Sequence, residues 1–195
     1  EIAKGFLINS GMVKIFEPLV DLQDKQLQSA TWYKNAASLI AQKTTARDLM
    51  RSGKLLQRPS AGRMSMFFYD PKTKQKLPFY DTFPLVLPFE LIRGGFIGLN
   101  FHYLPYGLRF KLLEQLQQFA TNTKFDQSTQ LRVTYNAIRK IDLVKPAIKK
   151  YLFNYVRSNF LRVDVNEMAI AVYLPVARFQ KASIQKVFAD SRRKI

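Results

Sequence analysis

The chain has 195 residues, of which 47% are hydrophobic and 13% aromatic, and it contains 31 Lys and Arg against 14 Asp and Glu. This length and hydrophobic content predict a folded core and exclude disorder as the main state. The net charge is +17. The chain has one histidine and no cysteine, which excludes a disulfide framework, a thiolate nucleophile and a Cys/His zinc site.

The first predicted element is a helix over residues 29–50. Apolar residues recur at helical spacing from Trp32 to Ile40, and Ser29 or Thr31 is a suitable N-cap. The stretch that follows, RSGKLLQRPSAGR, contains four bases and no acid, and we expect it to form a mobile basic loop.

Residues 63–104 are rich in aromatic and β-branched residues, with Pro and Gly between short runs. Three strands are predicted there, over residues 64–69, 83–91 and 96–103. Gly94 and Gly95 are expected to turn the chain between the last two strands, and Pro84 and Pro88 place the second strand at an edge. Short strands with tight turns favour a small SH3-like antiparallel β-barrel or a strongly bent sheet.

Helical spacing returns after Pro105. Helices are predicted over residues 105–119, 131–141, 145–156, 166–174 and 182–193. In the third of these, Pro146 falls in the first turn, where proline is tolerated, and Ile148 and Leu152 belong to an apolar stripe that could pack on a core. The lysines of that helix would then face outward.

Together these elements predict an α+β fold. Residues 1–62 form an N-terminal helical segment and basic loop, residues 63–104 form the β core, and residues 105–195 form a basic helical region packed on it. We expect the three segments to make one compact domain.

No apolar run approaches the roughly 18 residues that a membrane-spanning helix needs, so no membrane partner is expected. The chain begins with Glu1 rather than Met, which is expected of a processed product or of part of a longer chain. It does not begin with a basic segment followed by an apolar core, and a signal peptide is therefore not expected.

The excess of positive charge lies in residues 51–195. Residues 1–50 contain six bases and five acids, residues 51–125 contain eleven and four, and residues 126–195 contain fourteen and five. This asymmetry favours a polyanionic partner, with nucleic acid as the first hypothesis. The alternatives are a solvated surface and a surface that meets acidic neighbours in an assembly.

The basic residues form three candidate DNA-binding groups. The second group lies in DPKTKQKLP, where alternate spacing would place the lysines on one side of an extended segment, although a solvated hairpin tip has the same pattern. The candidate residues are Arg51, Lys54, Arg58 and Arg63; then Lys72, Lys74 and Lys76; then Arg139, Lys140, Lys145, Lys149, Lys150, Arg157, Arg162, Arg192 and Arg193.

A nuclease is the natural enzyme to consider for such a basic chain. Asp70, Asp81 and Glu90 lie near predicted strand ends, where a metal site could form. The Asp/Glu-x-Lys spacing of restriction-type nucleases is missing at Glu90, and turn formation is the stronger interpretation of the two aspartates. Phosphate-binding glycine loops and the G-x-S-x-G turn are also absent from the sequence, and His102 has a structural or stacking role by default. We therefore expect no catalytic residue, metal, cofactor or small-molecule substrate.

Three segments carry a resemblance to a known family: MSMFFYDPKTKQKLPFYDTFPLVLPFE, GGFIGLNFHYLP and YLPVARFQKASIQKVFADSRRKI. Over roughly residues 29–195, the chain resembles the DNA end protector proteins of large contractile-tailed, T-even-like phages. The resemblance implies a protein of the phage virion that binds the ends of double-stranded DNA. It also implies that the protein shields these ends from host exonuclease in the host cytoplasm after injection.

A cap for a duplex end needs phosphate neutralisation without base reading. Exposed aromatic rings that stack on the last base pair would add selectivity for ends. The candidate stacking residues are Tyr80, Tyr103 and Tyr106, with Tyr69 and Phe79 as further candidates, and each has burial in the core as its alternative.

Two other functions remain open from the sequence. The first is a structural component of a phage neck, tail or baseplate that uses its basic surface for protein contacts, and the second is a metal-dependent nuclease. The near-neutral residues 1–28, which include Phe16 and Leu19, hint at contacts with other proteins, and phage head or neck proteins are the expected partners.

Overall fold

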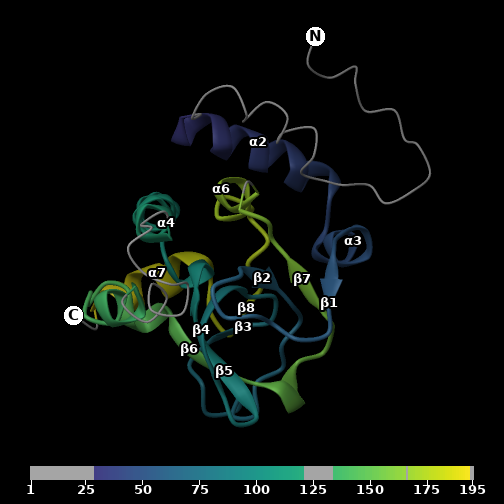
Figure 1. The fold of residues 1–195 in the computed structure, drawn as a ribbon, viewed down its shortest axis with the longest axis vertical. Helices are drawn as coiled ribbons and strands as arrows, with labels where there is room; N and C mark the ends of the chain where they lie inside the picture. Colours follow the sequence, from purple (N-terminus) through teal and green to yellow (C-terminus); the bar gives the residue numbers. More distant parts are fainter. Residues whose placement is uncertain (1–28, 121–133, 166, 194–195) are drawn as a thin grey trace.

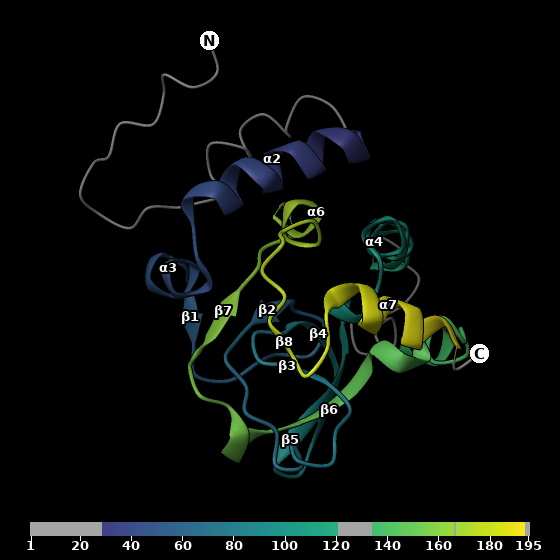
Figure 2. The ribbon, with the colours of Figure 1, turned by 180° about the vertical axis from the view of Figure 1, so that it is seen from behind.

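The computed structural model describes residues 29–120, 134–165 and 167–193, and it confirms an α+β fold with an antiparallel sheet. Helix α2 (Ala30–Lys43) lies above the short helix α6 (Met168–Ala171) at one end of the molecule (Figure 1). Seen from behind, α4 (Tyr106–Ala120) and α7 (Ile184–Arg193) lie together on one side of the sheet (Figure 2).

The segment predicted to be helical over residues 29–50 is confirmed as mostly helical, but it is divided into two helices rather than one. Helix α2 begins after Ser29, whose side chain accepts a hydrogen bond from the backbone N–H of Trp32. Helix α3 (Ala46–Ser52) begins after Thr45, which forms a capping box with Asp48. The reciprocal bonds of a capping box start a new helix there.

Six strands form one antiparallel sheet in the order β1-β7-β2-β4-β5-β6. They are β1 (Leu55–Leu56), β2 (Ser65–Met66), β4 (Leu85–Ile92), β5 (Gly95–Asn100), β6 (Ile148–Leu152) and β7 (Phe160–Arg162). A separate ribbon pairs β3 (Tyr80–Asp81) with β8 (Phe179–Gln180). The described strands form no closed barrel, and nothing in them confirms an SH3-like fold.

Two expectations about the sheet need correction. Strand β4 is central rather than at an edge, because it pairs with both β2 and β5. Pro88 is accommodated by a register shift between Pro88 and Glu90, which is a usual position for a proline inside a sheet. The hairpin between β4 and β5 turns at Arg93 and Gly94, with Gly94 at a positive φ of 76°, and Gly95 is already in the strand.

The helix predicted over residues 145–156 is also wrong. A 3-10 turn, η4 (Lys145–Ala147), leads into strand β6, and a second, η5 (Phe153–Tyr155), follows it. Strand β6 pairs with β5, and the ring of Tyr151 stacks on that of Phe96 at 5.2 Å. Pairing with a distant strand thus outweighs the local helical pattern.

The remaining C-terminal predictions are closer to the structure. Helix α4 confirms the helix after Pro105, α7 confirms the last helix, and α6 is a short part of the helix predicted over 166–174. Residues 134–138 are helical, while the start of the predicted 131–141 helix lies outside the described residues. Strands β1 and β7 and the ribbon strands β3 and β8 were not predicted.

Buried side chains form two clusters. The larger cluster takes residues from α2, the sheet and α4, including Tyr33, Leu99 and Leu112. The smaller one is aromatic, and in it the ring of Phe67 lies 4.9 Å from Phe160 and 5.3 Å from Tyr151. Within the described ranges, no helix is long and apolar enough to span a membrane.

Gly95 tests the close approach of β5 and β6. A Cβ atom at this position would lie 2.0 Å from the backbone carbonyl oxygen of Tyr151. We expect Gly95→Ala to lower the free energy of unfolding by about 2 kcal/mol in urea denaturation, because the paired strands must separate.

The control for this substitution is Gly107→Ala in α4. An added Cβ there has open space around it, and alanine favours a helix by up to about 1 kcal/mol over glycine. Equal stability of the two variants would contradict the register of β5 and β6.

Candidate nucleic-acid interface

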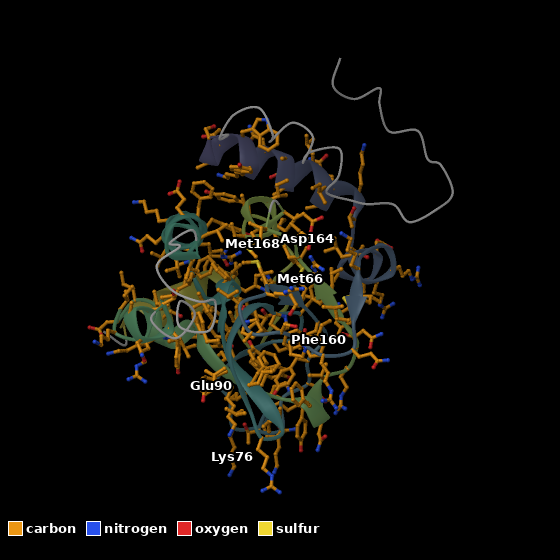
Figure 3. The ribbon with its side chains drawn as sticks, in the orientation of Figure 1. Met66, Lys76, Glu90, Phe160, Asp164 and Met168 are labelled. Carbon is orange, nitrogen blue, oxygen red and sulfur yellow. The ribbon has the colours of Figure 1, made fainter. Side chains whose placement is uncertain are left out.

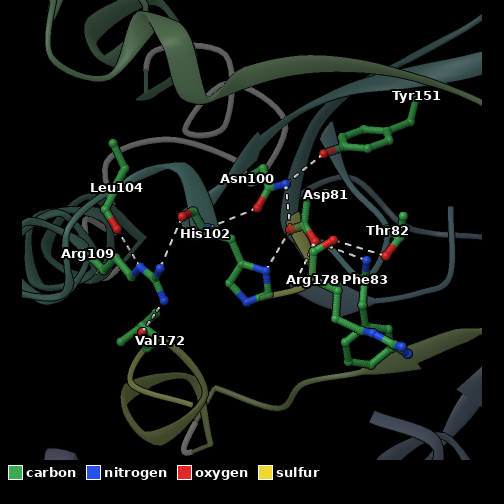
Figure 4. Close-up of polar contacts among 10 residues, drawn as sticks. All are labelled: Asp81, Thr82, Phe83, Asn100, His102, Leu104, Arg109, Tyr151, Val172 and Arg178. Atoms are coloured by element: carbon green, nitrogen blue, oxygen red, sulfur yellow. Dashed lines mark hydrogen bonds and ion pairs between the residues drawn. The ribbon is translucent and has the colours of Figure 1, made fainter. Parts of the chain in front are cut away.

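A buried polar centre joins β3, the end of β5 and the segment before β8 (Figure 4). The Asp81 carboxylate accepts hydrogen bonds from the backbone N–H groups of Phe83 and Arg178, at 3.0 and 3.1 Å. It also accepts one from the side-chain amide of Asn100 at 3.3 Å, and it lies 2.7 Å from Nδ1 of His102. These partners replace the water that a buried carboxylate loses.

Burial and neighbouring charges set the protonation of this pair. Burial lowers the pKa of His102, and the charge of Arg109 lowers it further, although Asp81 opposes both effects. Burial alone would raise the pKa of Asp81, but its interactions with His102 and with backbone N–H groups hold it below its ordinary value. At neutral pH the centre therefore contains an ionised carboxylate beside a neutral imidazole.

Arg109 is completely buried, and carbonyl groups surround its guanidinium. Its nitrogens donate to the carbonyl oxygens of Leu104 at 2.6 Å, Val172 at 3.1 Å and His102 at 3.1 Å. The guanidinium also lies over the ring of Tyr106, 4.3 Å from its centroid. Burial lowers the pKa of Arg109 to about 10, so the side chain stays charged at neutral pH.

The three acids considered for a nuclease do not converge. Asp81 is buried in the polar centre, Asp70 is partly exposed and pairs with Lys74, and Glu90 is exposed on β4. Among the described residues, no group of three or more His, Asp or Glu side chains could hold a metal ion.

The second predicted basic group forms consecutive turns, so the extended arrangement predicted for it is wrong. We name residues 70–77 the basic loop. Lys74 pairs with Asp70 at 2.9 Å, while Lys72 and Lys76 are exposed. Figure 3 places Lys76 at the end of the molecule opposite to α2.

Arg157, from the third predicted group, lies beside the basic loop. Its guanidinium is 3.9 Å from the Asp70 carboxylate, and the backbone N–H of Asp70 donates to the carbonyl of Tyr155. A β-bridge between Tyr69 and Val156 holds the two segments together. The structure thus brings together basic residues that are more than eighty positions apart.

One member of the first predicted group, Lys54, shares an acid with Arg162 of the third group. The stretch expected to be one mobile loop includes the end of α3 and strand β1, which pairs with β7. Lys54 and Arg162 both form ion pairs with Asp164, at 2.8 and 2.5 Å. Asp164 lies close to α6 and well apart from Lys76 in Figure 3. The other members of this group, Arg51, Arg58 and Arg63, are exposed.

The rest of the third group is dispersed over several elements. Lys145 pairs with Asp142, and Nζ of Lys149 lies 4.1 Å from the centroid of the Tyr103 ring. Lys150 is exposed on β6. Arg139 and Lys140 are exposed after the helical residues 134–138, and the side chains of Arg192 and Arg193 lie outside the described residues.

The aromatic candidates differ in how much of each ring is accessible. Tyr103 is buried, with 5% of its surface exposed, and so is Tyr69, whose hydroxyl accepts from the N–H of Leu152. Tyr106 is half-buried between Tyr173 and Arg109. Phe79 packs against Tyr103 and Phe179. Tyr80 is half-buried in β3, three residues after the end of the basic loop.

The sequence analysis missed three residues that hold the buried polar centre and the basic loop in place: Arg109, Arg178 and Lys181. Arg109 sits on a helix among other charged residues, where nothing in the sequence marks it as buried. Lys181 is the one described residue other than glycine with a positive φ, 68°, and its ammonium binds carbonyls of the basic loop. The roles of Arg178 and Lys181 follow only from the three-dimensional path of residues 178–181.

A family model described as Phage T4 terminal DNA protecting protein matches residues 11–192. The chain belongs to this family. The match confirms the resemblance carried by the three quoted segments, and it extends over most of the sequence. Comparison with curated proteins and with solved structures gives no match. In this member of the family, the basic loop carries two exposed lysines, Lys72 and Lys76, beside the pairs that Asp70 forms with Lys74 and Arg157.

Replacing Arg109 tests the contribution of its three hydrogen bonds to backbone carbonyls. Arg109→Met keeps much of the side-chain volume but leaves three buried carbonyl oxygens without their donors. We expect the free energy of unfolding to fall by about 3 kcal/mol in urea denaturation. Lys111→Met, at an exposed position of the same helix, is the control and should change stability by less than about 0.5 kcal/mol. Equal effects would contradict a structural role for Arg109.

Because the chain has one histidine, the effect of His102 on stability can be measured as a function of pH. Because the pKa of His102 is lowered in the folded chain, the unfolded chain binds the proton first as the pH falls below the ordinary value of 6.5. Protons then favour the unfolded state, and the stability of the protein should fall between pH 7 and pH 5. The lowered pKa of Asp81 acts in the same direction, but only at lower pH.

The matched variant for the pH test is His102→Gln. It should be less stable than the natural sequence, but its stability should change less between pH 7 and pH 5. Urea denaturation at each pH measures both curves. A rise in the stability of the natural sequence on acidification would show that His102 is instead protonated in the folded state.

Proposed function

We propose that the protein is a non-enzymatic DNA-binding protein that caps the ends of linear phage double-stranded DNA and protects them from host exonuclease. The family match over residues 11–192 carries this proposal. The net charge of +17 supports it, because phosphate neutralisation supplies most of the affinity of sequence-independent DNA binding.

The basic loop and its neighbours are the proposed first contact with DNA. The loop contains Lys72, Lys74 and Lys76, Lys181 binds its carbonyls, and its one carboxylate, that of Asp70, pairs with Lys74 and Arg157. Near α6, by comparison, one aspartate, Asp164, pairs with Lys54 of the first group and with Arg162 of the third. The other predicted basic residues remain secondary candidates for the DNA path.

Selectivity for an end needs a feature beyond charge. Among the aromatic candidates, Tyr80 is partly accessible and lies in strand β3, which follows the basic loop in the chain, so we place a stacking contact there. Tyr103 is the least suitable of the three, because a base reaches its ring only if the core opens.

The non-enzymatic part of the proposal rests on the use of the acids. Asp81 is committed to the buried centre, and Asp70 to the lysine and arginine beside it. We further propose that the protein resides in the virion and enters the host cytoplasm with the DNA. Head or neck proteins are its proposed protein partners, and it takes no small-molecule substrate.

Binding to a linear and a closed circular form of one duplex tests the proposal. We expect the linear form to bind more tightly at about 0.15 M salt, with affinity falling steeply as salt rises. The bound linear form should resist an exonuclease and should remain uncut in Mg²⁺ or Mn²⁺. Equal binding to both forms would leave a general polyanion binder, and no binding would favour a structural role in the virion.

Paired substitutions test which basic surface binds. Lys72→Gln with Lys76→Gln should lower the slope of log affinity against log salt by about 2, because each phosphate contact contributes roughly 0.9. Arg139→Gln with Lys140→Gln removes the same charge from another exposed site and serves as the comparison. A larger effect of the second pair would move the interface away from the basic loop.

A further inference from the structure

The backbone of the basic loop leaves several carbonyl groups directed to one point. Within the loop, the N–H groups of Lys76 and Leu77 donate to the carbonyl of Thr73, at 2.9 and 3.2 Å. These bonds use a carbonyl at the start of the turns. The later carbonyls, like those at the end of a helix, need donors from outside the turn.

Lys181 supplies these donors. Its Nζ atom lies 2.6 Å from the carbonyl oxygen of Lys74, 3.1 Å from that of Gln75 and 3.1 Å from that of Leu77. A lysine ammonium has three N–H donors, so the three carbonyls account for all of them. The side chain of Lys181 therefore closes the basic loop from a position more than one hundred residues away.

The backbone at Lys181 is itself unusual. Its φ of 68° lies in the left-handed region, which side chains other than glycine adopt at a cost. Glycine would adopt this conformation without strain, but it would supply no ammonium group. A lysine in this conformation indicates that the side-chain contact offsets the strain.

The backbone that precedes Lys181 is held by the buried polar centre. Strand β8 ends at Gln180, which pairs with Tyr80, and the N–H of Arg178 donates to the Asp81 carboxylate. The N–H and hydroxyl of Thr82 both donate to the carbonyl of Arg178 at 3.0 Å. Figure 4 shows the contacts of Arg178 with Asp81 and Thr82, and Lys181 follows three residues later, so these bonds fix the backbone that leads to Lys181.

Lys181 differs from the lysines of the basic loop in what its ammonium group binds. Carbonyl dipoles, rather than a carboxylate, offset the charge of Lys181 among the loop lysines. Lys181 is exposed as well, but its three donors are committed to carbonyls, whereas Lys72 and Lys76 form no ion pair within the described residues. A loop that is already ordered loses less entropy when its lysines bind phosphate groups.

We propose that Lys181 is a positioning residue: by binding three carbonyls of the basic loop, it holds the loop in the conformation that presents Lys72 and Lys76 to the DNA backbone. This rests on the proposed function for the DNA contact itself. The tether between Lys181 and the loop stands on geometry alone.

Lys181→Met in the full chain tests the tether first. Methionine keeps much of the length of the side chain and removes the ammonium. We expect the protected amides of Lys76 and Leu77 to exchange with solvent roughly tenfold faster, with little change elsewhere. Lys186→Met is the matched control, because it removes another exposed lysine, one that pairs with Asp190 in α7. Unchanged exchange in the loop of Lys181→Met would overturn the proposal.

DNA binding then separates positioning from direct contact. If Lys181 positions the loop, Lys181→Met should lower the salt slope as much as Lys72→Gln with Lys76→Gln does, and the triple variant should lose little more. If Lys181 contacts phosphate itself, the triple variant should lose roughly a further 0.9 in slope, which would overturn the proposal. Normal DNA binding by Lys181→Met would also overturn it.

The natural sequence serves as the reference that separates the two hypotheses. If it fails to prefer linear DNA, the proposed function is wrong, and the exchange of the loop amides still decides whether Lys181 tethers the loop. If the natural sequence prefers linear DNA, and Lys181→Met binds DNA as the natural sequence does while Lys72→Gln with Lys76→Gln binds more weakly, the positioning role is wrong. The proposed function then stands.

Discussion

The buried carboxylate of Asp81 is the constraint on which the rest of the structure depends. A charge this far from water is tolerated only when hydrogen-bond donors surround it. The donors come from Phe83, Arg178, Asn100 and His102, so that β3, the end of β5 and the segment before β8 must meet at one point. The path of residues 178–181, and with it the position of Lys181, follows from this requirement.

A second common feature is the use of backbone carbonyls in place of acids. The chain has 31 bases and 14 acids, so most bases cannot have a carboxylate of their own. Arg109 in the interior and Lys181 at the basic loop each bind three carbonyl oxygens. Cations needed for the fold are thus stabilised without acids, which leaves other lysines and arginines exposed to solvent and to phosphate groups.

Local patterns predicted the elements whose signals are local. The helix after Pro105 and the turn at Gly94 are examples, and the family itself followed from three quoted segments. Strand β6 was missed because the pairing of Tyr151 with Phe96 outweighs a helical stripe, and two-residue strands have no measurable period. The basic residues were visible from charge alone. Their pairing with acids, such as Lys54 with Asp164, joins positions that no local pattern connects.

The three carbonyls that hold Lys181 belong to the main chain, and every amino acid has one. The contact therefore places no demand on the side chains at positions 74, 75 and 77. A substitution of the exposed Gln75, for example, would leave its carbonyl in place for Lys181. What the loop displays at such a position can thus change while the backbone path that Lys181 holds stays the same.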